Sequence, residues 1–221
     1  MTEKLSLGFV GLGYWGVRLA RAAVASGEAA VAGGFARSPG ARASFVEEFG
    51  GRAHGDLASL LASEVDAVVI ATPINSHADI AVQAARVGRH VLVEKPITLD
   101  VASARRVVQA ADEAGVFLQV GHQRRRRAAT RRVGGLAASG ALGRVHSMEA
   151  TIFNADGLFP ADGHNHPDSW KFDPAQRVLG AMTQQGVHMI DNLLYLAGSA
   201  KRVSCLSKKI LGKSDIDDAT N

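Results

Sequence analysis

Apolar and polar positions follow two alternating patterns over the first 120 residues of the chain. Short uninterrupted apolar runs, typical of strands buried on both faces of a parallel sheet, are separated by longer segments with the composition of helices. The runs predict strands at residues 5–10, 30–35, 65–71, 90–93 and 116–120. The intervening segments predict helices at residues 17–25, 76–87 and 101–114. A further helix is predicted between the polar turn at 37–40 and residue 49. This alternation favours an α/β fold with a doubly wound parallel sheet.

The pattern changes after residue 121, where a second domain begins. It predicts an arginine-rich helix at 124–139, a strand at 144–153, a polar loop at 154–174, a helix from about 180 to 196 and a strand at 202–210. We therefore divide the chain into domains 1–122 and 123–221, the second of α+β class. Two strands form an open sheet with an unpaired edge. We expect this edge to be covered either by further residues of a longer chain or by a partner. We also expect the chain to be truncated in this domain.

Three glycines stand at the junction of the first predicted strand and helix. Gly11, Gly13 and Gly16 form a GxGxxG pattern with Tyr14 and Trp15 between the last two. In this context the first glycine permits a tight turn, the second lets the backbone approach a pyrophosphate, and the third allows close helix packing. The amide groups of the helix N-terminus then face the phosphates. The pattern predicts a Rossmann domain that binds a dinucleotide, the alternative being an ordinary glycine turn.

The end of the second predicted strand indicates which dinucleotide is bound. NAD enzymes usually carry an acidic residue here for the ribose 2′-hydroxyl. This chain has Arg37 and Ser38 instead, which could bind a 2′-phosphate through charge-assisted hydrogen bonds. We therefore favour NADP over NAD, although Arg37 could equally be a solvated turn residue.

Composition and charge exclude several other classes of protein. Hydrophobic residues make up 47% of the chain and charged residues 21%, which is typical of a globular protein. The net charge of +4 comes largely from basic clusters at 124–132 and 201–213, and neither is interleaved with aromatic residues, so we expect no nucleic-acid partner. No apolar run is long enough to cross a bilayer. With one cysteine, Cys205, the chain is expected to be cytoplasmic.

Further motifs resemble the glucose-fructose oxidoreductase and inositol dehydrogenase (Gfo/Idh/MocA) family. The resemblance runs from residue 7 to about 218 and includes the glycine turn, the segments 71–77, 88–91 and 120–122, the Glu94-Lys95-Pro96 motif, and 186–191. It implies hydride transfer between nicotinamide and a polyol, sugar or related hydroxy compound. It also implies a longer protein that forms a homo-oligomer, a dimer or tetramer. Cofactor contacts are expected from Thr72, Pro73, Asn75, His77 and Glu94, besides Lys95.

Two residues are candidates for catalysis. Lys95 follows a predicted buried strand at its carboxyl end, the sheet edge where ligands bind. The resemblance implies that it hydrogen-bonds the reacting oxygen, although it could be a surface lysine. His188 suits proton transfer near neutral pH. Helical spacing places it on one face with Gln184 and Asp191.

Gln184 departs from the pattern of the family. Its dehydrogenases often have aspartate at this position, and glutamine cannot accept a proton. Either His188 works with Lys95 alone, or the reaction differs from simple alcohol oxidation. The alternatives are cofactor-assisted lyase or hydrolase chemistry on a sugar, and a sensor that binds nicotinamide without turnover.

Substrate contacts are expected from the second domain as well as from Lys95 and His188. The candidates are Arg124, Arg125, His166, Trp170, Lys171 and Gln184. An aromatic face such as that of Trp170 stacks well on a sugar or inositol ring. His164 and His166 could be metal ligands, but two histidines without a third ligand do not define a zinc site. We therefore predict no metal.

Overall fold

The computed structural model describes residues 4–152, 182–208 and 219–220. The chain divides into two units, Met1–Gly121 and His122–Asn221. Each unit is described by itself.

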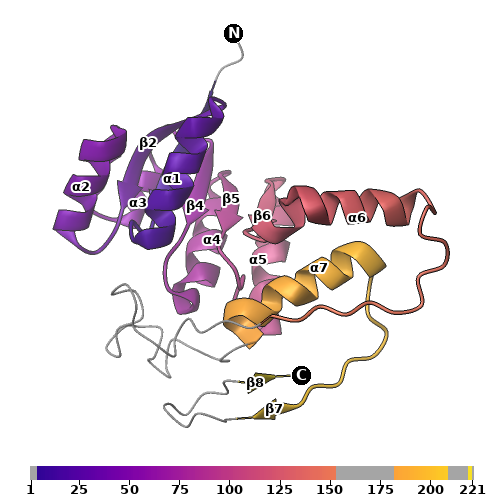
Figure 1. Cartoon of the computed structure of the whole chain (residues 1–221). Coiled ribbons are helices and arrows are strands. Elements are labelled where there is room, and N and C mark those ends of the chain that lie inside the picture. Colours follow the sequence, from indigo (N-terminus) through magenta and orange to yellow (C-terminus); the bar gives the residue numbers. More distant parts are fainter. Residues whose placement is uncertain (1–3, 153–181, 209–218, 221) are drawn as a thin grey trace. The chain divides into compact units, whose positions relative to one another are not determined.

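The first unit is a parallel sheet of six strands with helices on both faces (Figure 1). Its strands are β1 (Leu5–Val10), β2 (Ala29–Phe35), β3 (Arg52–Ala53), β4 (Ala67–Ile70), β5 (His90–Val93) and β6 (Leu118–Val120). Its helices are α1 (Tyr14–Ser26), α2 (Pro39–Phe49), α3 (Leu57–Leu61), the 3-10 turn η1 (Ile74–Ser76), α4 (His77–Arg86) and α5 (Val101–Ala114). The strand order β3-β2-β1-β4-β5-β6 is that of a Rossmann fold, which confirms the predicted class.

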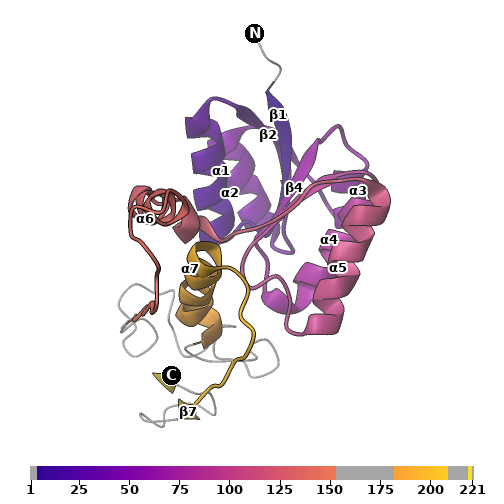
Figure 2. The same cartoon turned by 90° about the vertical axis from the view of Figure 1, so that its right-hand side faces the viewer.

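The sheet is buried between two helical layers. Helices α1 and α2 cover one face, and α3, α4 and α5 cover the other (Figure 2). Because successive side chains of a strand point to opposite faces, β4 contributes to both cores. Ala67 and Val69 pack with Phe45 of α2, whereas Val68 and Ile70 belong to the core on the opposite face. This explains why the strand is apolar at every position.

The strand order reverses at β1, which places a crevice at the carboxyl edge of the sheet. From β1 the chain proceeds to β2 and β3 on one side and later to β4, β5 and β6 on the other. All six strands are parallel, so the segments that follow β1, β2, β4 and β5 lie at the same edge. Ligands of such folds bind at this reversal point.

The predicted strands and helices of this unit are all present, with small shifts at their ends. Strand β5 and helix α5 have the predicted bounds, whereas α1 begins at Tyr14, three residues earlier than predicted. Three elements were not predicted, the two-residue strand β3, the five-residue helix α3 and the 3-10 turn η1. Elements this short do not repeat the hydrophobic period of a helix or strand several times, so the sequence pattern did not show them.

The second unit is of α+β class, as predicted. It contains η2 (Gln123–Arg126), α6 (Ala128–Ala138), a π-helical turn η4 (Met182–Gly186), α7 (Val187–Ala197), and an antiparallel pair formed by β7 (Ser207–Lys208) and β8 (Ala219–Thr220). Helices α6 and α7 pack closely, since a methyl group at Gly134 would lie 3.3 Å from the Tyr195 ring. No helix within the described ranges is both long and apolar enough to span a bilayer.

Two strand predictions for this unit were wrong. Residues 144–152 form no strand, and the strand predicted at 202–210 is reduced to Ser207–Lys208 within its described part. A strand requires a hydrogen-bonded neighbour, and residues 144–152 have none among the described segments. Apolar patterning therefore marked these segments without fixing their pairing.

Candidate active site

The glycine turn after β1 has the geometry that the sequence predicted. Gly11 has φ +89°, a conformation that favours glycine, and a methyl group on it would lie 2.5 Å from the carbonyl oxygen of Ala71. A methyl group on Gly16 would lie 2.0 Å from the carbonyl oxygen of Gly11. Both glycines are therefore required by packing within the protein.

Gly13 differs from its two neighbours in the motif. The space that a methyl group on Gly13 would occupy has no atom within 4 Å. Gly13 is also the N-cap residue of α1, and no side chain caps the amide groups of the first turn. An open cradle at a helix N-terminus suits an anionic group such as a pyrophosphate. The residues present therefore fit a dinucleotide.

Three polar side chains lie where β2 ends. Arg37 is exposed, and the Ser38 hydroxyl accepts a hydrogen bond from the Ala41 amide at 3.3 Å, which caps α2. Arg42 of α2 donates to the carbonyl oxygens of Ala36 at 2.6 Å and Arg37 at 3.2 Å. No sequence motif marks Arg42 as a site residue. Its guanidinium fixes the backbone that presents Arg37, and no carboxylate stands in this segment.

The segment after β4 is held by short polar contacts. The Ser76 hydroxyl lies 2.7 Å from the Thr72 hydroxyl and 2.7 Å from the Pro73 carbonyl oxygen. Asn75 lies in the 3-10 turn between them. His77, the first residue of α4, is only 1% exposed, and its ring nitrogens lie close to the carbonyl oxygens of Thr72 and Pro96.

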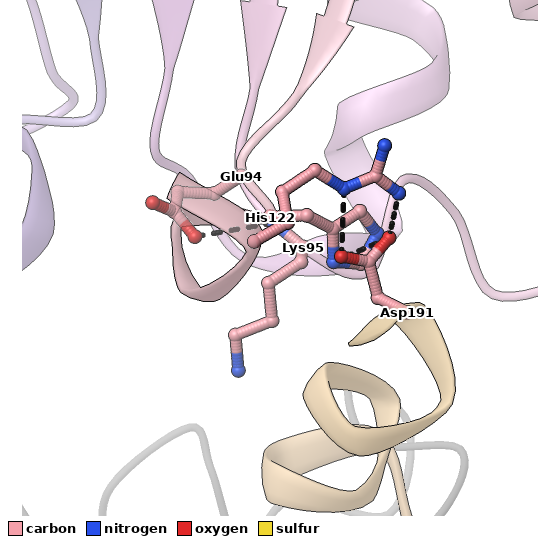
Figure 3. A network of polar contacts seen from close by, with 5 residues as sticks. Glu94, Lys95, His122 and Asp191 are labelled. Carbon is pink, nitrogen blue, oxygen red and sulfur yellow. Dashed lines mark hydrogen bonds and ion pairs between the residues drawn. The ribbon is translucent and has the colours of Figure 1, made fainter. Parts of the chain in front are cut away.

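The segment after β5 presents the candidate lysine. The Lys95 amide donates to its neighbour's carboxylate, Glu94 Oε2, at 3.1 Å, and the Lys95–Pro96 peptide is cis. Burial raises the pKa of Glu94, which is 9% exposed. The Lys95 side chain extends away from the end of the strand (Figure 3). The Glu94 carboxylate thus shapes the backbone turn from which the Lys95 ammonium projects.

In the second unit a buried carboxylate organises the polar residues. Asp191 of α7 is 7% exposed and accepts two hydrogen bonds from the Arg125 guanidinium, one of them at 2.9 Å from Nε (Figure 3). His122 Nδ1 lies 3.8 Å from the same carboxylate. A bidentate contact of this kind fixes both partners. Arg125, expected to contact substrate, here fixes η2 against α7.

His188 lies in the same helix and is 4% exposed. Its ring is 6.3 Å from that of His122, centre to centre, at 86°. His188 and Asp191 are the buried residues of α7, and the helical spacing had predicted that they share one face. Gln184 lies in the π-helical turn before α7, so the α-helical spacing assumed for it does not apply. Arg124 donates to Gln185 Oε1 at 2.8 Å.

His166, Trp170 and Lys171, with the alternative metal ligand His164, lie outside the described residues. His122 was not among the predicted site residues, although it stands in the family segment 120–122. Its only signal was its position next to Gly121 at the end of β6.

The Arg125–Asp191 pair leads to a prediction about stability. Arg125→Ala should lower the free energy of unfolding by about 2 kcal/mol, because a buried carboxylate loses both charge-assisted hydrogen bonds. Urea denaturation of the full-length protein measures this loss. Arg126→Ala removes the exposed arginine next in sequence and should change stability by less than about 0.5 kcal/mol. Equal effects of the two substitutions would show that the pair contributes nothing specific.

Comparison with known proteins identifies the family. Residues 5–122 match the GFO/IDH/MocA oxidoreductase family with an NAD-binding Rossmann fold, and residues 130–221 match the GFO/IDH/MocA C-terminal domain. The chain therefore belongs to the Gfo/Idh/MocA family of oxidoreductases, which confirms the resemblance seen in its motifs.

The names of individual relatives include a sugar substrate, a nicotinamide cofactor or both. The chain is 32% identical over 157 residues to 1,5-anhydro-D-fructose reductase from Ensifer adhaerens, covering 70% of this chain and 45% of that protein. A structure from Desulfitobacterium hafniense, provisionally named an NADPH-dependent oxidoreductase, has a TM-score of 0.91 at 32% identity, covering 100% of this chain and 62% of that one. The structure of levoglucosan dehydrogenase with bound NADH and levoglucosan has a TM-score of 0.85 at 26% identity, covering 99% of this chain and 62% of that one. The chain thus spans less than two thirds of the length of each of these three proteins.

Proposed function

We propose that the protein is an NAD(P)-dependent dehydrogenase or reductase that acts on a CH–OH group of a sugar, polyol or related hydroxy compound. The observation that carries this proposal is the arrangement of the first unit. The open cradle at Gly13, the basic segment at Arg37 and the turn at Lys95 follow three strands of one parallel sheet, at its carboxyl edge. Cofactor-binding and catalytic groups of α/β enzymes gather at that edge. The relatives named as sugar reductase and dehydrogenase support the substrate class.

The proposed chemistry assigns a separate task to each group. A bound nicotinamide would supply hydride-transfer chemistry between the cofactor and the carbinol carbon of the substrate or the carbonyl carbon of the corresponding ketone. Lys95 hydrogen-bonds the reacting oxygen and stabilises its developing negative charge through the ammonium group. An imidazole nitrogen of His188 accepts the hydroxyl proton during oxidation and returns it during reduction. Arg124, Arg125 and Gln184 are proposed substrate contacts, together with His166, Trp170 and Lys171.

NADP is the proposed cofactor, with NAD as second choice. The absence of a carboxylate after β2 and the exposed Arg37 support this preference. Arg37→Ala should weaken NADP binding by about tenfold to thirtyfold, because one charge-assisted hydrogen bond to the 2′-phosphate is lost, and should leave NAD binding nearly unchanged. Calorimetric titration with both cofactors measures the difference, with Arg105→Ala, an exposed arginine of α5, as control. Equal losses for NADP and NAD would remove the preference.

A panel of substrates tests the function as a whole. The full-length protein is incubated with NADP or NAD and a set of compounds that includes levoglucosan, scyllo-inositol and glucose. Absorbance of reduced nicotinamide that grows with time supports the dehydrogenase. Cofactor binding without turnover of any compound, in either direction, supports the sensor instead. We also propose that the protein is a cytoplasmic homo-oligomer, a dimer or tetramer, which light scattering of the full-length protein would measure.

Gln184 favours a second candidate function. The glutamine that stands in place of the aspartate common in the family's dehydrogenases cannot accept a proton, so a reaction other than simple alcohol oxidation stays open, such as one in which the sugar is oxidised only transiently. Such a lyase or hydrolase would release a product without net change in cofactor absorbance. Chromatography of the same incubations distinguishes it from a dehydrogenase.

A further inference from the structure

Two loops of the first unit follow neighbouring strands. The backbones of β4 and β5 are paired up to Ile70 and Val93, and the Glu94 amide donates to the Ile70 carbonyl oxygen at 2.9 Å. The loops 71–76 and 94–98 follow these two strands. The first contains Thr72, and the second contains Lys95.

His77 lies between these two loops. Its Nδ1 is 3.0 Å from the Pro96 carbonyl oxygen, and its Nε2 is 2.9 Å from the Thr72 carbonyl oxygen. The ring is 1% exposed, so water does not compete for either contact. As the first residue of α4, His77 is anchored by a helix whose buried face packs in the core of the sheet.

The two contacts of His77, with the Pro96 and Thr72 carbonyl oxygens, form a bridge between the loops. The two contacts of a neutral imidazole are not equivalent at any moment. Burial lowers the pKa of His77, whereas the two carbonyl oxygens favour the protonated ring. A neutral ring carries one N–H, so it donates to either Pro96 or Thr72, and the other nitrogen then faces a carbonyl oxygen without a proton between them. A change at one loop therefore alters the bond that His77 can offer to the other.

We propose that His77 is a positioning residue that ties the loop carrying Lys95 to the loop carrying Thr72, and so fixes the separation between the substrate-facing lysine and the cofactor-facing turn. This inference rests on the proposed function for the tasks of the two loops. It assigns His77 a task different from direct contact with the cofactor, since both ring nitrogens already face protein carbonyl groups.

Two substitutions separate the two halves of the bridge. The amide nitrogen of asparagine imitates histidine Nδ1, and that of glutamine imitates Nε2. His77→Asn should keep the bond to Pro96 and lose the bond to Thr72. His77→Gln should keep the bond to Thr72 and lose the bond to Pro96.

Hydrogen exchange of the free protein tests the bridge without cofactor or substrate. We expect His77→Asn to speed exchange in residues 71–76 by about tenfold and His77→Gln to speed exchange in residues 94–98 by about the same factor. Ser76→Ala, which removes the contacts to Thr72 and Pro73, should affect residues 71–76 alone and serves if a His77 variant does not fold. Uniform exchange changes across both loops, or none, would overturn the proposal.

Kinetics of the full-length enzyme then test the consequence for function. His77→Gln should lower kcat about tenfold with little change in cofactor Kd, because Lys95 loses its fixed position. His77→Asn should raise cofactor Kd about tenfold with a smaller change in kcat. Identical effects of the two variants, in proportion to lost folded protein, would show a merely structural role. If the wild-type protein binds no dinucleotide, the proposed function fails, while the exchange result still decides whether His77 ties the loops.

Discussion

Lys95→Ala is expected to lower turnover by a factor of about 10² to 10³ while the affinity for NADP and NAD stays within about twofold of the wild-type value. The reason is positional. Lys95 follows β5 at the carboxyl edge of the sheet, and its side chain extends away from the strand end (Figure 3). A charge that stabilises the reacting oxygen acts mainly in the transition state, so its loss lowers kcat more than it weakens binding.

Steady-state kinetics with the best substrate of the panel, and calorimetric titration of each cofactor, measure the two parts of this prediction. Lys4→Ala, an exposed lysine beside β1, is the matched control and should leave both values unchanged. Lys95→Arg keeps the charge with a different shape and should recover part of the rate. Turnover that survives in Lys95→Ala would disprove the assignment of Lys95, and a loss confined to cofactor affinity would make it a cofactor contact.

The first unit was predictable because each signal in its sequence is local. A strand buried on both faces is apolar at every position, as in β4, and a glycine turn links strand and helix within a few residues. Parallel strands then bring their carboxyl ends to one edge, so residues as distant in sequence as Gly13 and Lys95 could be assigned to a common edge from the pattern alone. The family motifs at the same positions made the assignment more specific.

The remaining features depend on contacts between distant residues. Nothing local marks Arg125 as the partner of Asp191, and a run of arginines equally suits substrate binding. The same holds for His77, whose two carbonyl partners lie 5 and 19 residues away. The segment at 144–152 shows the opposite error, since an apolar pattern predicted a strand that has no partner within the described part of the chain. Pairing and polar networks are fixed by the tertiary structure, so residue spacing does not determine them.

The glycine turn gives the second large effect, because two of its glycines should respond in opposite ways to the same substitution. Gly16→Ala should lower the free energy of unfolding by about 3 kcal/mol or more, since the new methyl group would meet the Gly11 carbonyl oxygen at 2.0 Å. The oxygen is a backbone atom of the turn, and the methyl carbon is attached directly to the backbone of α1, so neither atom can move independently. The gain of up to about 1 kcal/mol from alanine in a helix does not offset this clash.

Gly13→Ala should leave the protein as stable as the wild type or slightly more stable. Gly13 has φ −84° and ψ −162°, which alanine adopts without strain, and its methyl group would enter open space. If that space receives the pyrophosphate, the same methyl group prevents close approach of the backbone, and the Kd of both dinucleotides should rise at least about tenfold. Thermal denaturation and calorimetric titration of the two variants give the comparison. A Gly13→Ala protein that is stable and still binds dinucleotide with wild-type affinity would place the phosphates elsewhere. The added methyl group interferes only with a ligand that occupies the cradle, so unchanged affinity would mean that the dinucleotide does not enter it.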